Sequence, residues 1–165
     1  DGVEQCLISC DDGVYRFTPP ESEEQDWTVE KLVDEAASDA VLVDLDQDGE
    51  KELILISPFH GEHIYFYKKI DGDYKKVYTY DTADFAHAIY GGTLLGKPAV
   101  IIGHRKGERN LLLFTWEQEK GEYQVEILDR DCGPANVFKY ERGTEEVLIS
   151  TNREIDEVAM YTFEK

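Results

Sequence analysis

The residues best suited to chemistry lie in one short acidic segment, VDLDQDGEKEL at positions 43–53. Its carboxylates follow the pattern D-x-D-x-D-G-x-x-E, and they are Asp44, Asp46, Asp48 and Glu52. The backbone carbonyl of Glu50 would point the same way. Converging oxygens at this spacing suit a hard cation that takes about six to eight oxygen ligands, and Gly49 lets the chain bend between them. The segment therefore predicts a Ca²⁺ site built from these five residues.

Other interpretations of this segment are a solvated acidic turn and a Mg²⁺ site. Mg²⁺ is less suitable because it is usually bound through fewer protein ligands. An EF-hand needs a bidentate glutamate at about position 12 of the loop and helices on both sides. This chain has Leu55 at that position and strand-like runs on both sides, so an EF-hand is excluded. Because the cation would hold two strands together, its predicted role is structural.

Histidine, arginine and asparagine side chains form a second set of candidates. The proposed ligand-binding residues are His60, His87, His104, Arg105, Asn136, Asn152, Arg153 and Glu154, with His63 and Arg109 nearby in sequence. Histidine can act as a general acid or base near neutral pH, arginine can clamp a carboxylate, and asparagine suits hydroxyl groups. Phe59, Phe85 and Tyr90 could stack on a sugar ring. The alternative is that these side chains satisfy backbone groups in loops.

The elements that must position these residues follow a repeat of 47 residues. Four glycines keep this spacing: Gly2, Gly49, Gly96 and Gly143. Apolar runs that begin at Cys6, Leu53, Val100 and Val147 keep it too, as do the aromatic residues Tyr67, Phe114 and Tyr161. Repeats of about 40–50 residues built from short strands are typical of propeller blades.

Each unit offers up to four strand-like runs, which in the second unit are 40–43, 52–57, 64–67 and 74–80. Their β-branched and aromatic content favours strands, and a run such as LILIS suits a strand buried on both faces. The segment 29–37 comes nearest to helical periodicity, and we expect its first half to be an outer strand. We predict an all-β fold of four-stranded antiparallel propeller blades, with about 3.5 blades in this chain. An ordinary β-sandwich is the alternative.

We expect one partial propeller domain over residues 1–165, with units of about 1–38, 39–85, 86–132 and 133–165. An open half-propeller would leave apolar blade faces bare, which is unfavourable. The expected partner is therefore the N-terminal remainder of a longer propeller. A head-to-tail pair of identical chains is less favoured because both junctions would lack strands.

The acidic segment resembles the calcium loops of FG-GAP/VCBS-type repeats, the propeller repeats also found in integrin α-subunits. In that family, D-x-[DN]-x-[DN]-G-x-x-[DE] joins the first two strands of a blade. The resemblance covers the repeat architecture of the whole chain, and it implies a β-propeller with structural Ca²⁺. The metal motif is complete only once, because Gly91, Thr93 and Leu95 stand at the aligned positions of the next unit.

In such a blade the first strand starts, and the second strand ends, at the edge opposite the metal loop. The polar candidates should therefore gather at one mouth of the central channel, where a ligand site is expected. Binding of a carbohydrate or another small polar molecule is the first function considered, since no nucleophile elbow, P-loop or dinucleotide motif is present. A carbon–oxygen lyase or dehydratase acting on a sugar through histidine and arginine is the second, by fold-level analogy. A protein–protein interaction scaffold is the third.

Composition and charge limit the partners. The net charge of −19 disfavours nucleic acid, because a phosphate backbone would be repelled. No run of about 18 apolar residues exists, so no membrane span is expected. The three cysteines do not make a disulfide framework. A calcium loop favours an extracellular location, whereas the odd cysteine count and the absence of a visible signal-peptide pattern favour the cytoplasm.

Overall fold

The computed structural model describes residues 4–58 and 61–164, and their regular structure is almost entirely β-strand. Four antiparallel sheets follow one another along the chain. The first contains β1 (Cys6–Cys10), β2 (Gly13–Thr18) and β3 (Thr28–Val33). The second contains β4 (Asp39–Val43), β5 (Glu52–Ile56), β6 (Ile64–Ile70) and β7 (Asp73–Tyr80).

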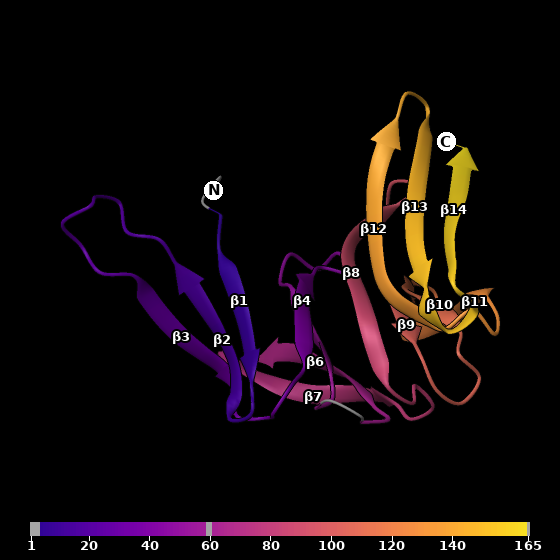
Figure 1. Cartoon of the computed structure of the whole chain (residues 1–165). Helices are drawn as coiled ribbons and strands as arrows, with labels where there is room; N and C mark the ends of the chain where they lie inside the picture. The colour runs from indigo at the N-terminus through magenta and orange to yellow at the C-terminus, as the bar shows by residue number, and fades with distance from the viewer. Residues whose placement is uncertain (1–3, 59–60, 165) are drawn as a thin grey trace.

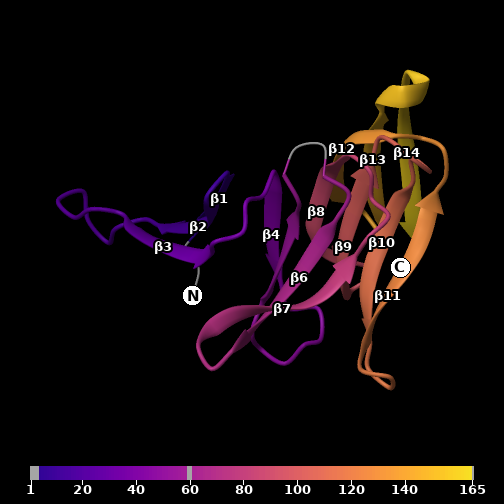
Figure 2. The same cartoon turned by 90° about the horizontal axis from the view of Figure 1, so that it is seen from below.

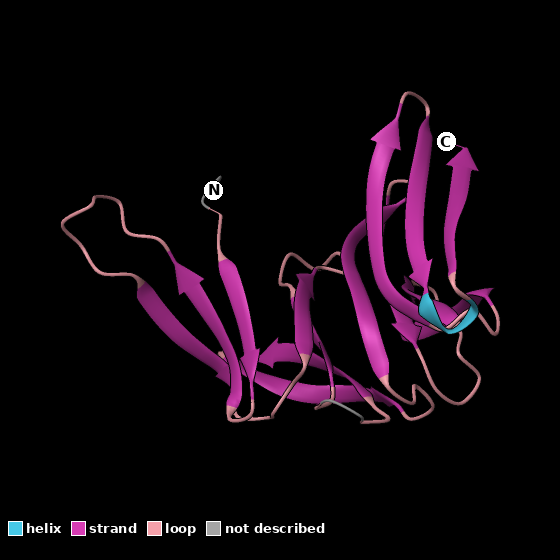
Figure 3. Ribbon diagram, in the orientation of Figure 1, coloured by secondary structure: helices cyan, strands magenta, loops and turns pink. Residues whose placement is uncertain are grey.

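The third sheet contains β8 (Ala86–Leu94), β9 (Lys97–His104), β10 (Leu111–Glu117) and β11 (Glu122–Asp129). The fourth contains β12 (Pro134–Arg142), β13 (Glu145–Asn152) and β14 (Glu157–Glu164), with a short 3₁₀ turn η1 (Arg153–Ile155) before β14. Figure 3 shows that this turn is the one helical element drawn among the described residues. Accordingly, the described part of the chain has no helix long and apolar enough to cross a membrane.

Strand order within every sheet is the order along the chain, so each sheet is a meander of hairpins. The first strands β1, β4, β8 and β12 contact one another in succession. The sheets therefore lie in a row from the N-terminal to the C-terminal end (Figure 1). Over the described ranges this row stays open and closes into neither a barrel nor a ring.

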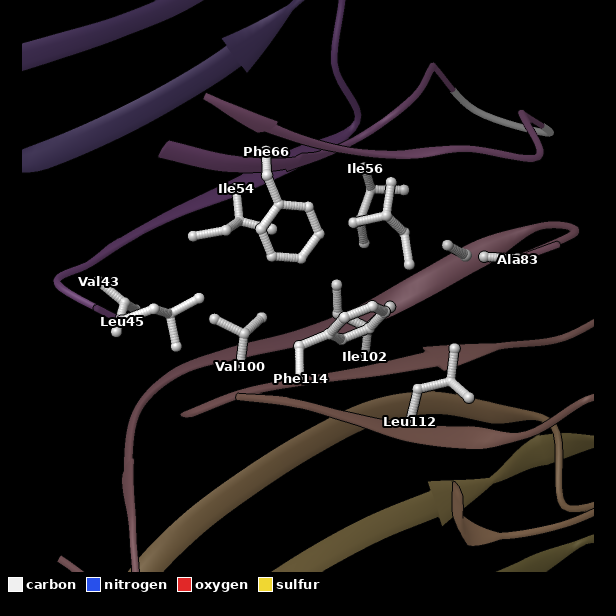
Figure 4. Packing of buried hydrophobic residues seen from close by; sticks show 12 residues of the cluster. Val43, Leu45, Ile54, Ile56, Phe66, Ala83, Val100, Ile102, Leu112 and Phe114 are labelled. Carbon is white, nitrogen blue, oxygen red and sulfur yellow. The ribbon is translucent and has the colours of Figure 1, made fainter. Parts of the chain in front are cut away.

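Apolar clusters fill the space between neighbouring sheets. The largest lies between the second and third sheets, where Phe66 and Phe114 are fully buried with ring centroids 5.3 Å apart. Figure 2 shows these two sheets from below, and Figure 4 shows the side chains that meet between them. Every residue of β5 is buried because this strand has a neighbouring sheet on each face, which explains its continuous apolar run.

The strands expected in the second unit are all present, and the first half of segment 29–37 is part of the outer strand β3. The spacing of 47 residues, however, does not extend to β13, although Tyr161 of β14 keeps it and faces the third sheet as Phe114 faces the second. Leu53 and Val100 each face the preceding sheet, and their counterpart in the fourth sheet is Leu148 rather than Val147. The step from Val100 to Leu148 is 48 residues. Because side chains alternate between the faces of a strand, this one-residue difference reverses the faces that a 47-residue alignment assigns to β13.

Candidate metal site and the opposite histidine edge

The acidic loop, residues 44–51, joins β4 to β5 at one edge of the second sheet. Asp44, Asp46 and Asp48 each place one carboxylate oxygen within 4.8 Å of the others. The chain achieves this convergence by bending at Gln47 and Gly49, whose φ angles are +60° and +96°. Glycine adopts this region at little cost, so Gly49 suits the tightest part of the loop.

Backbone N–H groups hold the aspartates in place. The amide of Gly49 donates to Asp44 Oδ2 at 3.1 Å, and the amide of Glu50 donates to Asp48 Oδ1 at 2.8 Å. The other oxygen of Asp44, Oδ1, is buried and has no hydrogen-bond partner among the described residues. A buried carboxylate oxygen without a partner is costly, so this atom is available for a cation.

Glu52, the first residue of β5, is 1 % exposed, and its carboxylate contacts the backbone at the start of the loop. Its Oε2 accepts the amide hydrogen of Leu45 at 2.7 Å. Its Oε1 has no hydrogen-bond partner in the described chain and lies 3.4 Å from the ammonium group of Lys68. Burial raises the pKa of Glu52 above its usual value, because a buried charged carboxylate is disfavoured. The last predicted ligand, Glu50, has an exposed side chain 3.8 Å from Lys69 Nζ.

Lys68 of β6 provides positive charge beside the acidic loop. Its ammonium pairs with the carboxylates of Asp46 and Glu52 and lies 4.4 Å from the centre of the Trp116 ring. Burial alone would lower the pKa of Lys68, but the pairs with Asp46 and Glu52 raise it overall. The lysine therefore stays charged, and it neutralises part of the loop.

The third sheet also reaches the acidic loop. Gln118 donates a hydrogen bond through Nε2 to the backbone carbonyl of Asp46 at 2.6 Å. The hydroxyl of Tyr123 is buried without a hydrogen-bond partner in the described chain. The pKa of Tyr123 is raised, first by burial and then by the negative charges of Glu52, Asp46 and Asp48. The loop is thus a junction between two sheets, and its oxygen donors suit a hard cation such as Ca²⁺.

Sequence reasoning did not identify Lys68, Trp116, Gln118 or Tyr123. The order of the strands could have indicated them. In a meander, the third strand ends at the same edge of the sheet as the loop between the first two strands, so residues near the end of the third strand lie beside that loop. β6 and β10 both end at this edge, and β11 starts there. Gln47 and Trp116 also line a cavity of about 600 Å³ beside the loop, between the loop and the third sheet.

The opposite edge of the sheets, called here the histidine edge, holds the described polar candidates in segments 61–63, 85–88, 103–110, 132–137 and 150–154. His104 is 1 % exposed, and both of its ring nitrogens have backbone partners. Nδ1 lies 2.9 Å from the carbonyl oxygen of Lys106, and Nε2 accepts the amide hydrogen of Asn110 at 3.1 Å. Burial lowers the pKa of His104. This ring is therefore neutral and ties the hairpin between β9 and β10 together.

Arg105 joins the third and fourth sheets at the histidine edge. Its Nε and Nη2 lie 2.9 and 2.7 Å from Glu154 Oε1, and its guanidinium lies 4.8 Å from the centre of the Phe85 ring. The hydrogen bonds from Arg105 lower the pKa of Glu154. Two predicted ligand residues thus bind each other across a sheet boundary.

The remaining candidates are placed as follows. Asn152 is fully buried, accepts a hydrogen bond from Ser150 Oγ at 2.6 Å and donates one to Glu157 Oε1 at 3.0 Å. Asn136 is exposed and accepts the amide hydrogen of Val137 at 2.8 Å, and Arg153 is exposed in η1.

The histidines other than His104 are also tied to nearby groups where the structure describes them. His87 Nδ1 lies 2.9 Å from the carbonyl oxygen of Ala135. His63 Nδ1 lies 3.2 Å from Asp81 but has no hydrogen-bond partner in the described chain. His60 and Phe59 lie outside the described residues. The structure therefore brings Arg105 and Glu154 together, and it gives the described histidines separate partners.

Comparison of the chain with models of known protein families gives no match. A comparison with curated proteins gives none either.

Proposed function

We propose that the chain is a calcium-stabilised part of a β-propeller of the FG-GAP/VCBS type, and that it serves as a binding module. The observation that carries the proposal is the acidic loop, where three aspartate oxygens converge and Asp44 Oδ1 is buried without a hydrogen-bond partner in the described chain. Asp44, Asp46, Asp48, Glu52 and the carbonyl of Glu50 would hold Ca²⁺. The ion would offset the mutual repulsion of the carboxylates and hold β4 to β5.

The arrangement of the sheets supports the propeller part of the proposal. Each sheet is a meander of three or four strands, and the first strands of successive sheets lie side by side. The outer faces of the two terminal sheets carry exposed apolar side chains, which include Ile8 and Val29 on the first and Phe138, Val158 and Met160 on the fourth. Exposed apolar surface of this kind is typical of a face that packs on another element, so further blades would cover both faces.

The metal proposal is tested by calcium titration in a calorimeter and by thermal unfolding with and without Ca²⁺. The double variant Asp44→Asn, Asp48→Asn keeps the loop's shape and removes two charges. The matched control is Asp73→Asn, an exposed aspartate at the start of β7. Binding by the wild-type chain and the control, lost in the double variant, is the expected result. Equal binding by all three proteins would place the ion elsewhere.

Binding is favoured over catalysis by the state of the histidine edge. A general base must be within hydrogen-bond reach of its substrate, but His104 is buried with both ring nitrogens occupied. Arg105, one of the arginines through which a lyase could act, is already paired with Glu154. A sugar lyase or dehydratase at this edge therefore has less support than a binding module or an interaction scaffold.

A second candidate function is binding of a carbohydrate or another small polar molecule beside the acidic loop. The cavity of about 600 Å³ there is lined by Trp116 together with the amide side chains of Gln47, Gln118 and Gln124. An aromatic ring with neighbouring amides can pack on an apolar sugar face and bind its hydroxyl groups. A glycan array followed by titration of hits against Trp116→Ala tests this, with at least a tenfold loss of affinity expected. A hit that binds the variant equally well would exclude this cavity.

A further inference from the structure

The ammonium group of Lys68 lies against the carboxylates of the acidic loop. It contacts two predicted metal ligands, Asp46 and Glu52, and lies 3.4 Å from the Oε1 atom of Glu52 that has no hydrogen-bond partner in the described chain. Lys69 is the next residue. Within the described chain it forms an ion pair only with Glu50, at 3.8 Å. Lys68 is therefore placed as a counter-ion of the loop's ligands, whereas Lys69 is at their margin.

Burial strengthens the ion pair between Lys68 and Glu52. Glu52 is 1 % exposed, and the Lys68 side chain is 24 % exposed. Attraction between opposite charges increases as water is excluded, and the Trp116 ring adds a cation–π contact, with its centre 4.4 Å from the ammonium. A divalent ion entering the loop would approach the same two carboxylates and would repel the ammonium. Lys68 and Ca²⁺ therefore compete.

We propose that Lys68 is the protein's own cation at the acidic loop, and that it sets the calcium affinity of the site by competing for Asp46 and Glu52. The proposal rests on the proposed calcium function. In the calcium-free chain Lys68 neutralises part of the loop, and Ca²⁺ binds only when the ammonium gives up its contact with at least one carboxylate. The affinity is therefore weaker than the four carboxylates alone would provide.

Trp116 gives this competition an optical readout. The chain has two tryptophans, and the other one, Trp27, is 53 % exposed and lies just before β3. In a Trp27→Phe background Trp116 is the single tryptophan. Movement of the Lys68 ammonium away from its ring would then change the emission during a calcium titration.

The test measures Ca²⁺ affinity calorimetrically for the wild-type chain, Lys68→Met, Lys68→Arg and Lys75→Met. Lys75 is the matched control because it is an exposed lysine of the same sheet that pairs only with Asp71 among the ion pairs of the described chain. Lys68→Met should bind Ca²⁺ at least tenfold more tightly than the wild type. Lys68→Arg, which keeps the charge, should stay close to the wild type, and Lys75→Met should not differ from it.

The outcomes separate the two proposals. Binding by the wild type that becomes at least tenfold tighter in Lys68→Met supports competition. Equal or weaker binding by Lys68→Met, while Asp44→Asn, Asp48→Asn abolishes binding, overturns the role of Lys68 and leaves the calcium site standing. No binding by any variant overturns both. Should Lys68→Met fail to fold, Trp116 emission in the Trp27→Phe chain decides, because emission that is unchanged at saturating Ca²⁺ contradicts displacement.

Discussion

The two edges of the sheets both concentrate polar residues, but they differ in how those residues are satisfied. At the histidine edge, His104 and Asn152 are buried with protein partners for their polar atoms, and Arg105 is paired with Glu154. At the acidic loop, Asp44 Oδ1 and Glu52 Oε1 are buried without a hydrogen-bond partner in the described chain. Buried polar groups in folded proteins are normally hydrogen-bonded. At the histidine edge, His63 Nδ1 also lacks a hydrogen-bond partner in the described chain, but it lies 3.2 Å from the carboxylate of Asp81. The acidic loop, where two carboxylate oxygens lack partners, is therefore the edge that points more strongly to a ligand.

The comparison shows that residue type alone is a weak guide to a site. Histidine and arginine are the chemically versatile residues here, and the fold uses them to fasten loops and sheets. Aspartate is common on surfaces, but at this loop the backbone directs several carboxylates to one point and leaves part of their bonding capacity unused. The candidate site is therefore distinguished by buried polar atoms that have no hydrogen-bond partner in the described chain.

The largest expected effect concerns the loop. Ligand binding to the folded state alone stabilises it, by about 2.7 kcal/mol when the ligand concentration is 100 times the dissociation constant. We expect Ca²⁺ at that excess to raise the free energy of unfolding of the wild-type chain by about this amount. Urea denaturation with and without Ca²⁺ measures it. A chain with Asp44→Asn and Asp48→Asn should show no calcium-dependent increase in the free energy of unfolding. The full increase in this variant would mean that the acidic loop does not differ from the histidine edge in binding the ion.

The second effect tests whether Asn152 is satisfied in the way the structure shows. Asn152→Ala removes the partner of Ser150 Oγ and Glu157 in a buried position. Leaving buried polar groups unpaired costs about 1–3 kcal/mol, so we expect a loss of about 2 kcal/mol in urea denaturation. Calcium affinity, measured on the same protein, should stay at the wild-type value. A change in affinity would mean that the two edges are coupled.

The third effect is a pH dependence due to His104. Its pKa in the folded chain is lowered from the usual 6.5 by burial, so the unfolded chain takes up the proton first as pH falls. The stability that neutral His104 contributes is fully present above about pH 6.5 and is lost below it, at up to about 1.4 kcal/mol per pH unit. We expect wild-type stability to fall more steeply than that of His104→Gln between pH 7.5 and 5.5. Parallel curves would show that His104 titrates normally.

The smallest effect concerns Arg105. Arg105→Lys keeps the charge but loses the paired contacts to Glu154 Oε1 and the guanidinium contact with the Phe85 ring, because lysine lacks the guanidinium fork. We expect a small decrease in melting temperature. This decrease should become smaller at high salt, because salt screens charges at the surface. A large loss of stability would indicate that the third and fourth sheets depend on this contact far more than on their apolar cluster.

The sequence predicted the strands of the second sheet and the location of the acidic loop because both depend on local patterns. Apolar runs define β4 and β5, and the spacing of the aspartates sets the convergence of their oxygens. Lys68 and Trp116 were not predictable in the same way, because their contact with the loop requires two sheets to be packed against each other. The burial of His104 was not predictable either, since a histidine next to a basic turn gives no sign that two backbone groups will satisfy its ring.

The 48-residue step between the third and fourth sheets has a consequence for protein engineering. Repeat units are commonly shuffled or averaged into a consensus by aligning their sequences at a constant length. In this chain such an alignment would match Val100 to Val147 and place every grafted side chain of β13 on the wrong face. The offset is local, because Tyr161 of β14 is again 47 residues from Phe114 and faces the preceding sheet as Phe114 does. Blocks exchanged between these units must therefore be matched strand by strand by facing direction and not by sequence number.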